Sequence, residues 1–271
     1  MPELSIRIAV RDDMEDIAAI SRRTWDGDDY LEKKAGRWIR DHSLYAGELE
    51  GVVVGTFRLS QMPRGVLWME GLRVHPEYRN RGYGRQLADA AFNTGKDIIE
   101  SGRAGCMEFS TYFRNDESIH ISLSQGFRVV NRFILMNRES IDSAEIPERA
   151  DVSIEDFISL PGHIPCGWKY PRVCPEGVEW ALQRSDAWRS GDILFLRERS
   201  SGEVTPIKGA EIDPDGFLDG AEAAALRAGD SHSCIILHES ADRVIARAYE
   251  RSYDTWEPVE NCNVLIFRYN I

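Results

Sequence analysis

Apolar positions in the first half of the chain recur with the periods of helices and strands. Met14, Ile17 and Ala18 begin a helical spacing after two aspartates that suit a helix N-cap, so a first helix is expected to end near Thr24. Further along, the pattern predicts a helix over 31–41, strands over 43–49, 52–60 and 66–74, a helix from near Gln86 to Gly102, a strand over 106–112, a helix over 115–124 and a strand over 128–137. The strand at 66–74 is nearly continuous in apolar residues, which is typical of a buried central strand.

The pattern changes after residue 139. Residues 140–150 are polar, contain a proline and are predicted to form a linker. Four prolines between 161 and 175 then indicate a loop-rich stretch. Beyond it the pattern predicts strands over 193–198 and 204–212, a helix over 219–227, a strand over 234–238, a helix over 241–250 and a strand over 263–269. The chain is therefore expected to be an α/β protein with one domain at 1–139 and a smaller α+β domain at 151–271.

Composition and charge narrow the class of protein. The 271 residues are 42% hydrophobic and 29% charged, which suits a globular chain long enough for two domains. The net charge is −12, and residues 151–271 alone hold 12 Lys and Arg against 21 Asp and Glu. A surface of this sign repels nucleic acid, so no nucleic-acid partner is expected.

The sequence also gives expectations about compartment and metals. It has no run of 18 or more apolar residues and no signal-peptide pattern at its start, so no membrane partner and a cytoplasmic location are expected. Five scattered cysteines do not suggest a disulfide framework. His163-x-x-Cys166 with Cys174 leaves a metal site as an alternative, but the C-x-x-C spacing of zinc sites is absent, and no metal is expected.

The most informative stretch joins the strand at 66–74 to the next helix. It contains four arginines and two glycines, namely Arg73, Arg79, Arg81, Arg85, Gly82 and Gly84. A strand, a glycine-containing turn and a helix N-terminus make an anion site, because unpaired backbone N–H groups meet the positive end of the helix dipole. A Walker-type loop needs Gly-Lys-Ser/Thr and the dinucleotide fingerprint needs a third glycine, and neither is present. The four cations are expected to offset the phosphates of some other ligand.

The spacing Arg79-x-x-Gly82-x-Gly84, following Leu72-x-Val74, resembles the acetyl-CoA signature of the GNAT superfamily of N-acetyltransferases. The predicted order of elements over 5–137 resembles that family's fold, a central mixed β-sheet flanked by helices. The resemblance implies acetyl-CoA as cosubstrate, held at its pyrophosphate by backbone N–H groups of the turn and at its pantetheine by the preceding strand. The implied cofactor-binding positions are Leu72, Arg73, Val74, Arg79, Asn80, Arg81, Gly82, Tyr83, Gly84, Arg85 and Asn115.

The elements predicted after residue 193 repeat the late order of the first domain. Two interpretations stay open, a degenerate second GNAT-like domain and an unrelated α+β domain. The stretch that corresponds to the acetyl-CoA loop, residues 212–220, carries three aspartates and would repel phosphates. One cofactor site per chain is therefore expected.

Glu70 is the candidate general base because it is the one acid in the central strand. It also lies two residues before Leu72, a position at which the resemblance to GNAT enzymes implies a general base. The alternative is a glutamate paired with an arginine for structural reasons. The resemblance implies a tyrosine general acid at a position where this chain has Ser122. Tyr112, at the end of the preceding strand, is the candidate substitute, and solvent is the alternative proton donor.

The segment between the first two predicted helices, Trp25-Asp-Gly-Asp28-Asp29-Tyr30, is a candidate acceptor site. Its carboxylates and aromatic rings suit a cationic substrate, so Trp25, Asp28, Asp29 and Tyr30 are candidate substrate-binding residues. The motif Asp-Gly-x-Asp-Tyr-Leu, followed by Trp38, resembles the GNAT subgroup that includes vertebrate histidine N-acetyltransferase. This resemblance implies an amino acid or small amine as acceptor. A solvated acidic loop is the alternative.

Two functions follow from these patterns. The first is an acetyl-CoA-dependent N-acetyltransferase acting on a small amine or amino acid, and the second is a non-catalytic protein that senses acetyl-CoA. The sequence leaves the oligomeric state open, with a homodimer as one option.

Overall fold

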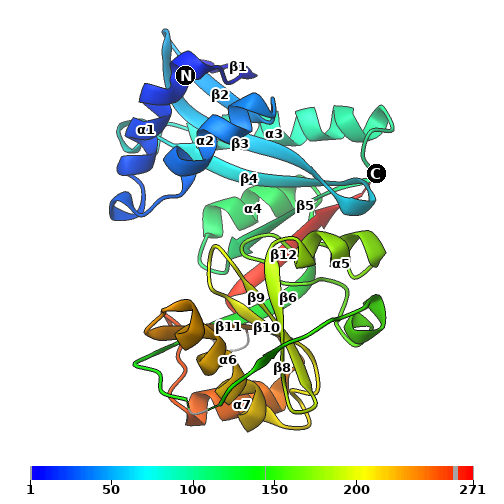
Figure 1. The fold of residues 1–271 in the computed structure, drawn as a ribbon. Helices are drawn as coiled ribbons and strands as arrows, with labels where there is room; N and C mark the ends of the chain where they lie inside the picture. Colours follow the sequence, from blue (N-terminus) through cyan, green and yellow to red (C-terminus); the bar gives the residue numbers. More distant parts are fainter. Residues whose placement is uncertain (1, 144, 259–261, 271) are drawn as a thin grey trace. The chain divides into compact units, whose positions relative to one another are not determined.

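The computed structural model describes residues 2–143, 145–258 and 262–270 and has a mixed α/β fold (Figure 1). Packing divides these residues into two compact units. Unit 1 lies within Met1–Phe109, His120–Phe127 and Arg268–Ile271, and unit 2 within Ser110–Ile119 and Arg128–Phe267. Each unit is defined by contacts and consists of several separate segments of the chain. The domain boundaries at 139 and 151 therefore stay a prediction from the sequence.

Unit 1 contains the sheet and helices on which the loop after the central strand is mounted. Its elements are β1 (Ser5–Ile8), α1 (Met14–Arg22), α2 (Leu31–Arg40), β2 (Leu44–Leu49), β3 (Val52–Met62), β4 (Val66–Val74), α3 (Tyr83–Glu100), and most of β5 (Cys106–Tyr112) and α4 (Asp116–Ser124). The strands follow the order β1-β2-β3-β4-β5, antiparallel except for the parallel pair β4–β5. The predicted helices and strands of this region are confirmed within a few residues. β1 was missed, and α3 begins three residues before Gln86.

Two glycines let α3 lie close to the sheet. Gly47 of β2 and Gly55 of β3 face each other across the strands. A Cβ atom at Gly47 would lie 2.7 Å from Leu87 Cδ2, and one at Gly55 would lie 2.4 Å from Leu87 Cδ1. The neighbouring Ala46 packs in the core formed with α1 and α2, and successive side chains of a strand point to opposite faces. The first two helices and α3 therefore cover opposite faces, and α3 begins close to the end of β4.

Unit 2 repeats part of this order. Its elements are β6 (Arg128–Glu139), β7 (Glu148–Arg149), α5 (Pro175–Leu182), β8 (Ser185–Ser190), β9 (Ile193–Glu198), β10 (Val204–Lys208), α6 (Pro214–Ala228), β11 (His232–His238), α7 (Asp242–Glu250) and most of β12 (Val264–Tyr269). The strand order is β12-β6-β11-β10-β9-β8-β7, with β10 and β11 parallel. Three antiparallel strands, a helix, a strand and a helix succeed one another from β8 to α7, as they do from β2 to α4. This order supports a degenerate GNAT-like domain, which stays a prediction.

The sequence missed three elements of unit 2 and misplaced the ends of two more. The short strand β7 lies in the stretch that was predicted to be a linker. α5 was assigned to loop because of its prolines, but Pro175 is its first helical residue, where proline is favoured. β8 has a polar sequence and exists through its pairing with β9. The predicted strand over 204–212 ends at Lys208, and the helix expected at 219 begins at Pro214.

A buried carboxyl group lies in unit 2 at the start of β10. Glu203 is 8% exposed, and its Oε2 atom has no hydrogen-bond partner among the described residues. The nearby Glu198 carboxylate accepts hydrogen bonds from the backbone and hydroxyl groups of Ser200 and Ser201. Burial, with the Glu198 charge as a second cause, raises the pKa of Glu203 from 4.5 to about 7.

This shift predicts a pH-dependent stability. Below pH 4.5, Glu203 is neutral in both the folded and unfolded chains. As the pH rises towards 7, the unfolded chain ionises first, so the carboxyl group lowers the free energy of unfolding. Relative to wild type, Glu203→Gln is expected to gain about 3 kcal/mol between pH 4.5 and pH 8. Urea unfolding at both pH values measures the gain. Glu239→Gln, at an exposed glutamate of the same unit, is the control, and an equal change in both variants would contradict the account.

Candidate cofactor and acceptor site

The parallel strands β4 and β5 pair over a short length only. Their register joins Val66 to Cys106, Leu67 to Met107 and Trp68 to Glu108, and no pairing between them continues beyond this point in the described residues. β4 itself runs on to Val74. Alternate residues of a strand direct their N–H and C=O groups to the same edge. Beyond Glu70, the edge of β4 that faces away from β3 is therefore available to an extended ligand.

The segment after β4 is fixed by its own side chains. It forms a short 3₁₀ turn, Pro76–Tyr78, in which His75 Nδ1 accepts a hydrogen bond of 3.3 Å from the Glu77 N–H group. Burial and the nearby Arg23 charge lower the pKa of His75, which keeps this nitrogen an acceptor at neutral pH. Arg79 Nε then donates to the Val74 carbonyl at 3.1 Å. The loop is thus held in shape before any ligand arrives.

The loop and the start of α3 present a continuous run of free backbone donors. Asn80 and Gly82 both have left-handed conformations, with φ of 59° and 76°, and Gly82 is the N-cap of α3 without a side-chain cap. The first turn of α3 contains no acidic residue. Among the described residues, none of the backbone N–H groups from Asn80 to Arg85 has a hydrogen-bond partner, whereas the next, Gln86 N–H, bonds to the Gly82 carbonyl. Six successive donors at the positive end of a helix form a strong anion site.

The corresponding helix of unit 2 is closed to anions. α6 begins after Asp213, whose carboxylate accepts a hydrogen bond of 3.0 Å from the Gly216 N–H group. The side chain thus occupies the place where a phosphate would bind. This agrees with the prediction that the acidic segment at 212–220 does not hold the cofactor.

The four arginines of the loop do not act together. Arg73 is bound to Asp29, Arg79 to the Val74 carbonyl and Arg85 to Asp89. Arg81 lies over the ring of Tyr78, with its Cζ 5.6 Å from the centroid. The Arg73 guanidinium already has a buried carboxylate partner, so its charge is largely balanced without a ligand. Sequence spacing could not reveal this partner, which lies 44 residues away. The expectation that all four cations offset the ligand's phosphates stays a prediction.

Glu70 is paired with an arginine. Its Oε1 atom lies 2.6 Å from Arg58 Nη1 and accepts a hydrogen bond of 3.2 Å from the Ser60 hydroxyl group. Both members of the ion pair are largely buried, with 13% of the Glu70 side chain and 11% of the Arg58 side chain exposed. Its identification as general base stays a prediction. The alternative of a structurally paired glutamate describes the observed contact, and the two roles are compatible.

Arg58 is the residue near this carboxylate that the sequence did not single out. Its Nε donates to the Ser43 hydroxyl group at 2.8 Å, and its Cζ lies 4.6 Å from the Trp38 ring centroid. A guanidinium held at three points gives the Glu70 carboxylate a fixed orientation. The only hint of this ion pair in the sequence was an arginine in the strand that pairs with β4. Which residue of β4 the arginine faces is set by a bulge between Thr56 and Arg58.

The candidate acceptor loop is bound to the cofactor strand by Arg73. Arg73 Nε and Nη2 donate to the two Asp29 carboxylate oxygens at 3.0 and 3.2 Å, and the Asp29 side chain is fully buried. The Arg73 Cζ also lies 4.2 Å from the Trp25 ring centroid and 5.3 Å from that of Tyr30. The structure thus brings Trp25, Asp29 and Tyr30 together, but around a cation of the chain itself. Asp28 is exposed in the same loop.

This pairing predicts that Asp29 stabilises the fold. Asp29→Asn leaves the largely buried Arg73 guanidinium without its counter-charge and is expected to lower the free energy of unfolding by about 3 kcal/mol. Asp28→Asn makes the same chemical change at the exposed neighbouring aspartate and is the matched control. It is expected to change the free energy of unfolding by less than about 0.5 kcal/mol. Urea unfolding without ligand measures both. Equal stability of the two variants would show that Asp29 has no structural role.

The remaining predicted residues lie in unit 2. The Tyr112 hydroxyl group is 3.5 Å from Glu257 Oε2, and burial together with that carboxylate raises the pKa of Tyr112, so the phenol keeps its proton at neutral pH. Asn115 Nδ2 donates to the Thr111 hydroxyl group at 3.1 Å. The roles of Tyr112 as general acid and of Asn115 as cofactor ligand stay predictions.

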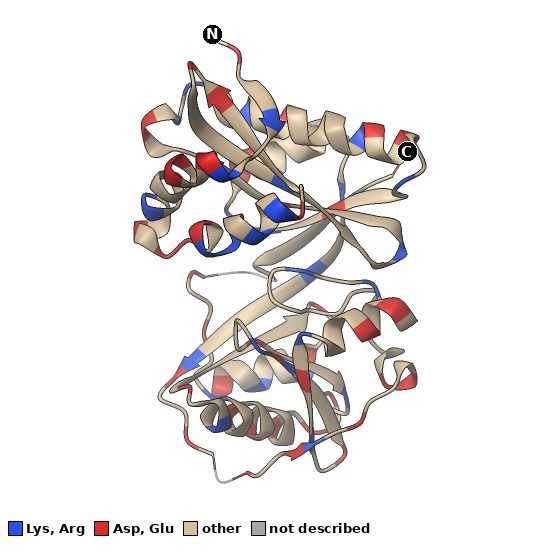
Figure 2. Ribbon diagram, turned by 45° about the horizontal axis from the view of Figure 1, so that its top comes forward, with Lys and Arg blue, Asp and Glu red and all other residues tan. Residues whose placement is uncertain are grey.

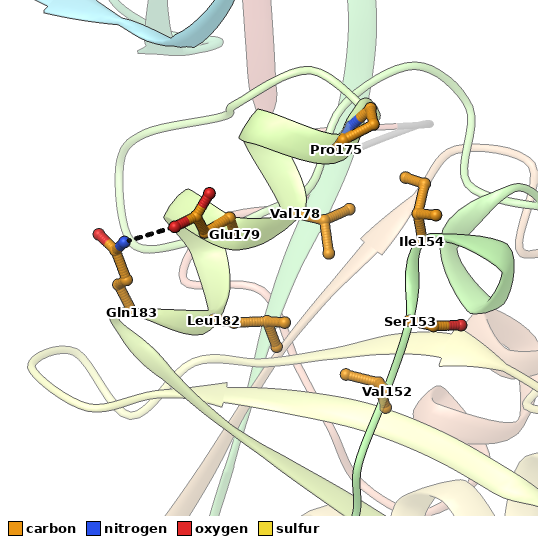
Figure 3. A pocket seen from close by; sticks show the side chains of 8 residues that line it. All are labelled: Val152, Ser153, Ile154, Pro175, Val178, Glu179, Leu182 and Gln183. Carbon is orange, nitrogen blue, oxygen red and sulfur yellow. Dashed lines mark hydrogen bonds between the residues drawn. The ribbon is translucent and has the colours of Figure 1, made fainter.

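A surface hollow of about 460 Å³ lies in unit 2 and contains none of the predicted site residues (Figure 3). Val152, Ile154, Val178 and Leu182 give it an aliphatic lining, and Gln183 donates to Glu179 at its rim. It offers no cation for a phosphate. The loop before α3 therefore remains the candidate for the cofactor.

The described residues contain neither a candidate membrane span nor a candidate metal site. No helix there has the length and apolar character needed to cross a bilayer. No group of three or more His, Cys, Asp or Glu side chains there is arranged to hold a metal ion.

Comparison with known proteins identifies the class of this region. Residues 11–127 match the model of the Acetyltransferase (GNAT) family. This stretch contains the loop, α3 and the candidate acceptor segment. It is therefore similar to the GNAT acetyltransferases, and the predicted GNAT fold is confirmed. No curated protein matches the chain.

Solved structures share the fold over nearly the whole chain. A proposed acetyltransferase from Thermoplasma acidophilum has 16% sequence identity and a TM-score of 0.68, covering 98% of this chain and all of the other. One from Pyrococcus horikoshii has 14% identity and a TM-score of 0.63, covering 100% and 90%. A GCN5-related N-acetyltransferase from Sphaerobacter thermophilus has 13% identity and a TM-score of 0.63, covering 98% and 95%. These likenesses extend the shared fold beyond residue 127.

Proposed function

We propose that the chain is an acetyl-CoA-dependent N-acetyltransferase acting on the amine of a small molecule such as an amino acid. The run of unpartnered backbone N–H groups from Asn80 to Arg85 carries the proposal. A pyrophosphate offers the acceptor oxygens that these donors lack, and the nearby edge of β4 at Leu72 to Val74 suits an extended pantetheine. The GNAT region over 11–127 supports the same cosubstrate.

Transfer to an amine needs a group that removes a proton from the ammonium form of the acceptor. We assign this step to Glu70, whose orientation is set by Arg58 and Ser60. The acetyl carbonyl would be polarised by the backbone of β4 at Leu72. Tyr112, with its proton retained, is assigned the return of a proton to the leaving thiolate.

The proposed acceptor site uses the exposed face of the loop between α1 and α2. Trp25 is 62% exposed and adopts a left-handed conformation, with φ of 48°, that is unusual for a bulky residue. Arg73 stacks on this ring and on Tyr30, so the aromatic wall is rigid. Because Asp29 is occupied by Arg73, the charge that attracts an acceptor ammonium group is assigned mainly to Asp28. A small amine of the kind used by the histidine N-acetyltransferase subgroup fits this assignment.

A sensor that binds acetyl-CoA without turnover is the second candidate. One observation favours it, since both acids expected to meet the amine, Glu70 and Asp29, are paired with guanidinium groups of the chain itself. Ser122, in place of the family's usual tyrosine, points the same way.

An assay that detects the thiol of released CoA, in the presence of each member of a panel of amino acids and small amines, tests the proposal. At least one acceptor is expected to accelerate release well above the rate with acetyl-CoA alone. Tight binding of acetyl-CoA by calorimetry, with no acceleration by any acceptor, would instead establish the sensor. The proposal keeps the chain in the cytoplasm, where its five cysteines stay reduced, and includes no nucleic-acid or membrane partner.

A further inference from the structure

A second hollow in unit 2, of about 290 Å³, is lined by guanidinium groups. It lies among β7, β8, β9 and the last turn of α6. Its charged and aromatic lining consists of Arg149, Asp186, Trp188, Arg197 and Arg227. None of these residues belongs to the acetyl-CoA loop or to the candidate acceptor segment.

Two of the three arginines lie over one indole ring. The Arg149 Cζ lies 4.1 Å from the Trp188 ring centroid, and the Arg227 Cζ lies 5.5 Å from the same ring. Arg197 is 8% exposed, so its charge is held in a largely desolvated position. Like charges repel when they converge. Keeping three guanidinium groups around one hollow therefore costs free energy unless an anion joins them.

The carboxylates nearby do not balance these cations. Asp186 is shared by Arg149 at 2.7 Å and Arg199 at 2.9 Å, and Asp230 pairs with Arg197. Arg227 has no ion pair among the described residues. Four guanidinium groups thus face two carboxylates. This local excess of positive charge lies in a segment with 12 basic and 21 acidic residues, which are interspersed over its elements in Figure 2.

Two buried donors of the lining also lack acceptors. Trp188 Nε1 and Arg197 Nε have no hydrogen-bond partner among the described residues, although both atoms are buried. A buried N–H group without an acceptor costs about 1–3 kcal/mol. Both residues line the same hollow, beside the Arg227 guanidinium that has no ion pair among the described residues. Together these groups indicate a missing acceptor of negative charge.

We propose that this hollow binds a small oxyanion, a carboxylate or phosphate group of a metabolite. Its volume is at the lower end of ligand pockets and limits the ligand to a compact molecule. Arginine is the side chain best matched to the planar or tetrahedral oxygens of such groups, and Trp188 supplies an apolar wall. The site is separate from the proposed acetyl-CoA loop, and either assignment stands if the other fails.

Calorimetric titration of the full chain with inorganic phosphate and, separately, succinate at constant ionic strength tests this site. Arg227→Gln removes a guanidinium that has no ion pair to lose, and it is expected to weaken binding at least about tenfold. Arg243→Gln, at an exposed arginine of α7 outside the hollow, removes the same charge and is expected to bind as wild type does. Binding of either anion with this difference between the two variants supports the site. The anion that binds more tightly shows whether the natural ligand presents a phosphate or a carboxylate group.

Two results would overturn the inference. One is the absence of saturable binding of both anions to the wild-type chain. The other is equal binding by Arg227→Gln and Arg243→Gln. A parallel titration of Gly82→Asp shows whether phosphate binds instead at the loop before α3. Phosphate binding that is lost in Gly82→Asp but kept in Arg227→Gln would place the anion at that loop and would also contradict the proposal.

Discussion

Gly82→Asp is expected to weaken acetyl-CoA binding at least about a hundredfold, or ~2.7 kcal/mol. Gly82 is the N-cap of α3 and lies within the run of free N–H groups from Asn80 to Arg85. A carboxylate placed there would accept from these donors itself, as Asp213 does at the start of α6. It would also repel the pyrophosphate. Calorimetric titration with acetyl-CoA measures the loss.

Gly102→Asp is the matched control for this change. Gly102 has a φ of 75°, against 76° for Gly82, and follows the other end of the same helix. No atom lies within 4 Å of a Cβ atom added there. Both variants therefore impose similar backbone strain, which aspartate tolerates better than most residues do. Gly102→Asp is expected to keep wild-type affinity, and a similar loss in both variants would remove the loop from the cofactor site.

Glu70→Gln is expected to lower the rate of acetyl transfer about 100- to 10,000-fold while acetyl-CoA still binds. Glutamine preserves the shape of the side chain and can still accept from Ser60 and Arg58, but it cannot take the proton of an ammonium group. The pH dependence of the rate is expected to change with it. Steady-state release of CoA across a pH series, with the best acceptor of the panel, measures both effects.

Glu48→Gln is the control for loss of an ion pair. Glu48 is a half-buried strand glutamate bound to Arg7 at 2.7 Å, in the same sheet but outside the proposed site. Its substitution is expected to leave the rate and its pH profile as in wild type. If Glu70→Gln gives the same pH–rate profile as Glu48→Gln, Glu70 is a structural partner of Arg58 and not the base.

The conformation of the loop before α3 could be predicted because its information is local. Strand, turn and helix follow one another within twenty residues, and the free N–H groups depend on backbone conformations that Gly82 favours and on the absence of a capping side chain. The same logic predicted that the acidic segment at 212–220 differs, and Asp213 does accept a hydrogen bond at the start of α6. Both conclusions need only the order of residues along the chain.

The ion pairs around the site could not be predicted, because they join distant segments. Arg58 faces Glu70 only because a bulge shifts the register between β3 and β4. Asp29 and Arg73 meet across 44 residues, where the loop after α1 contacts the cofactor strand. Because of this contact, the loop from Trp25 to Tyr30, which the sequence suggested was open to a cationic substrate, already binds the Arg73 guanidinium.

Protection of backbone amides by acetyl-CoA tests the central claim most directly. The amide resonances of Asn80 to Arg85, followed by NMR in the full chain, are expected to shift and to exchange more slowly with solvent when acetyl-CoA is added, since each N–H group gains an acceptor. The amides at the start of α6, from Asp215 to Phe217, are expected to stay unchanged. Saturable acetyl-CoA binding that leaves the amides of Asn80 to Arg85 unaffected would contradict the assignment of this loop.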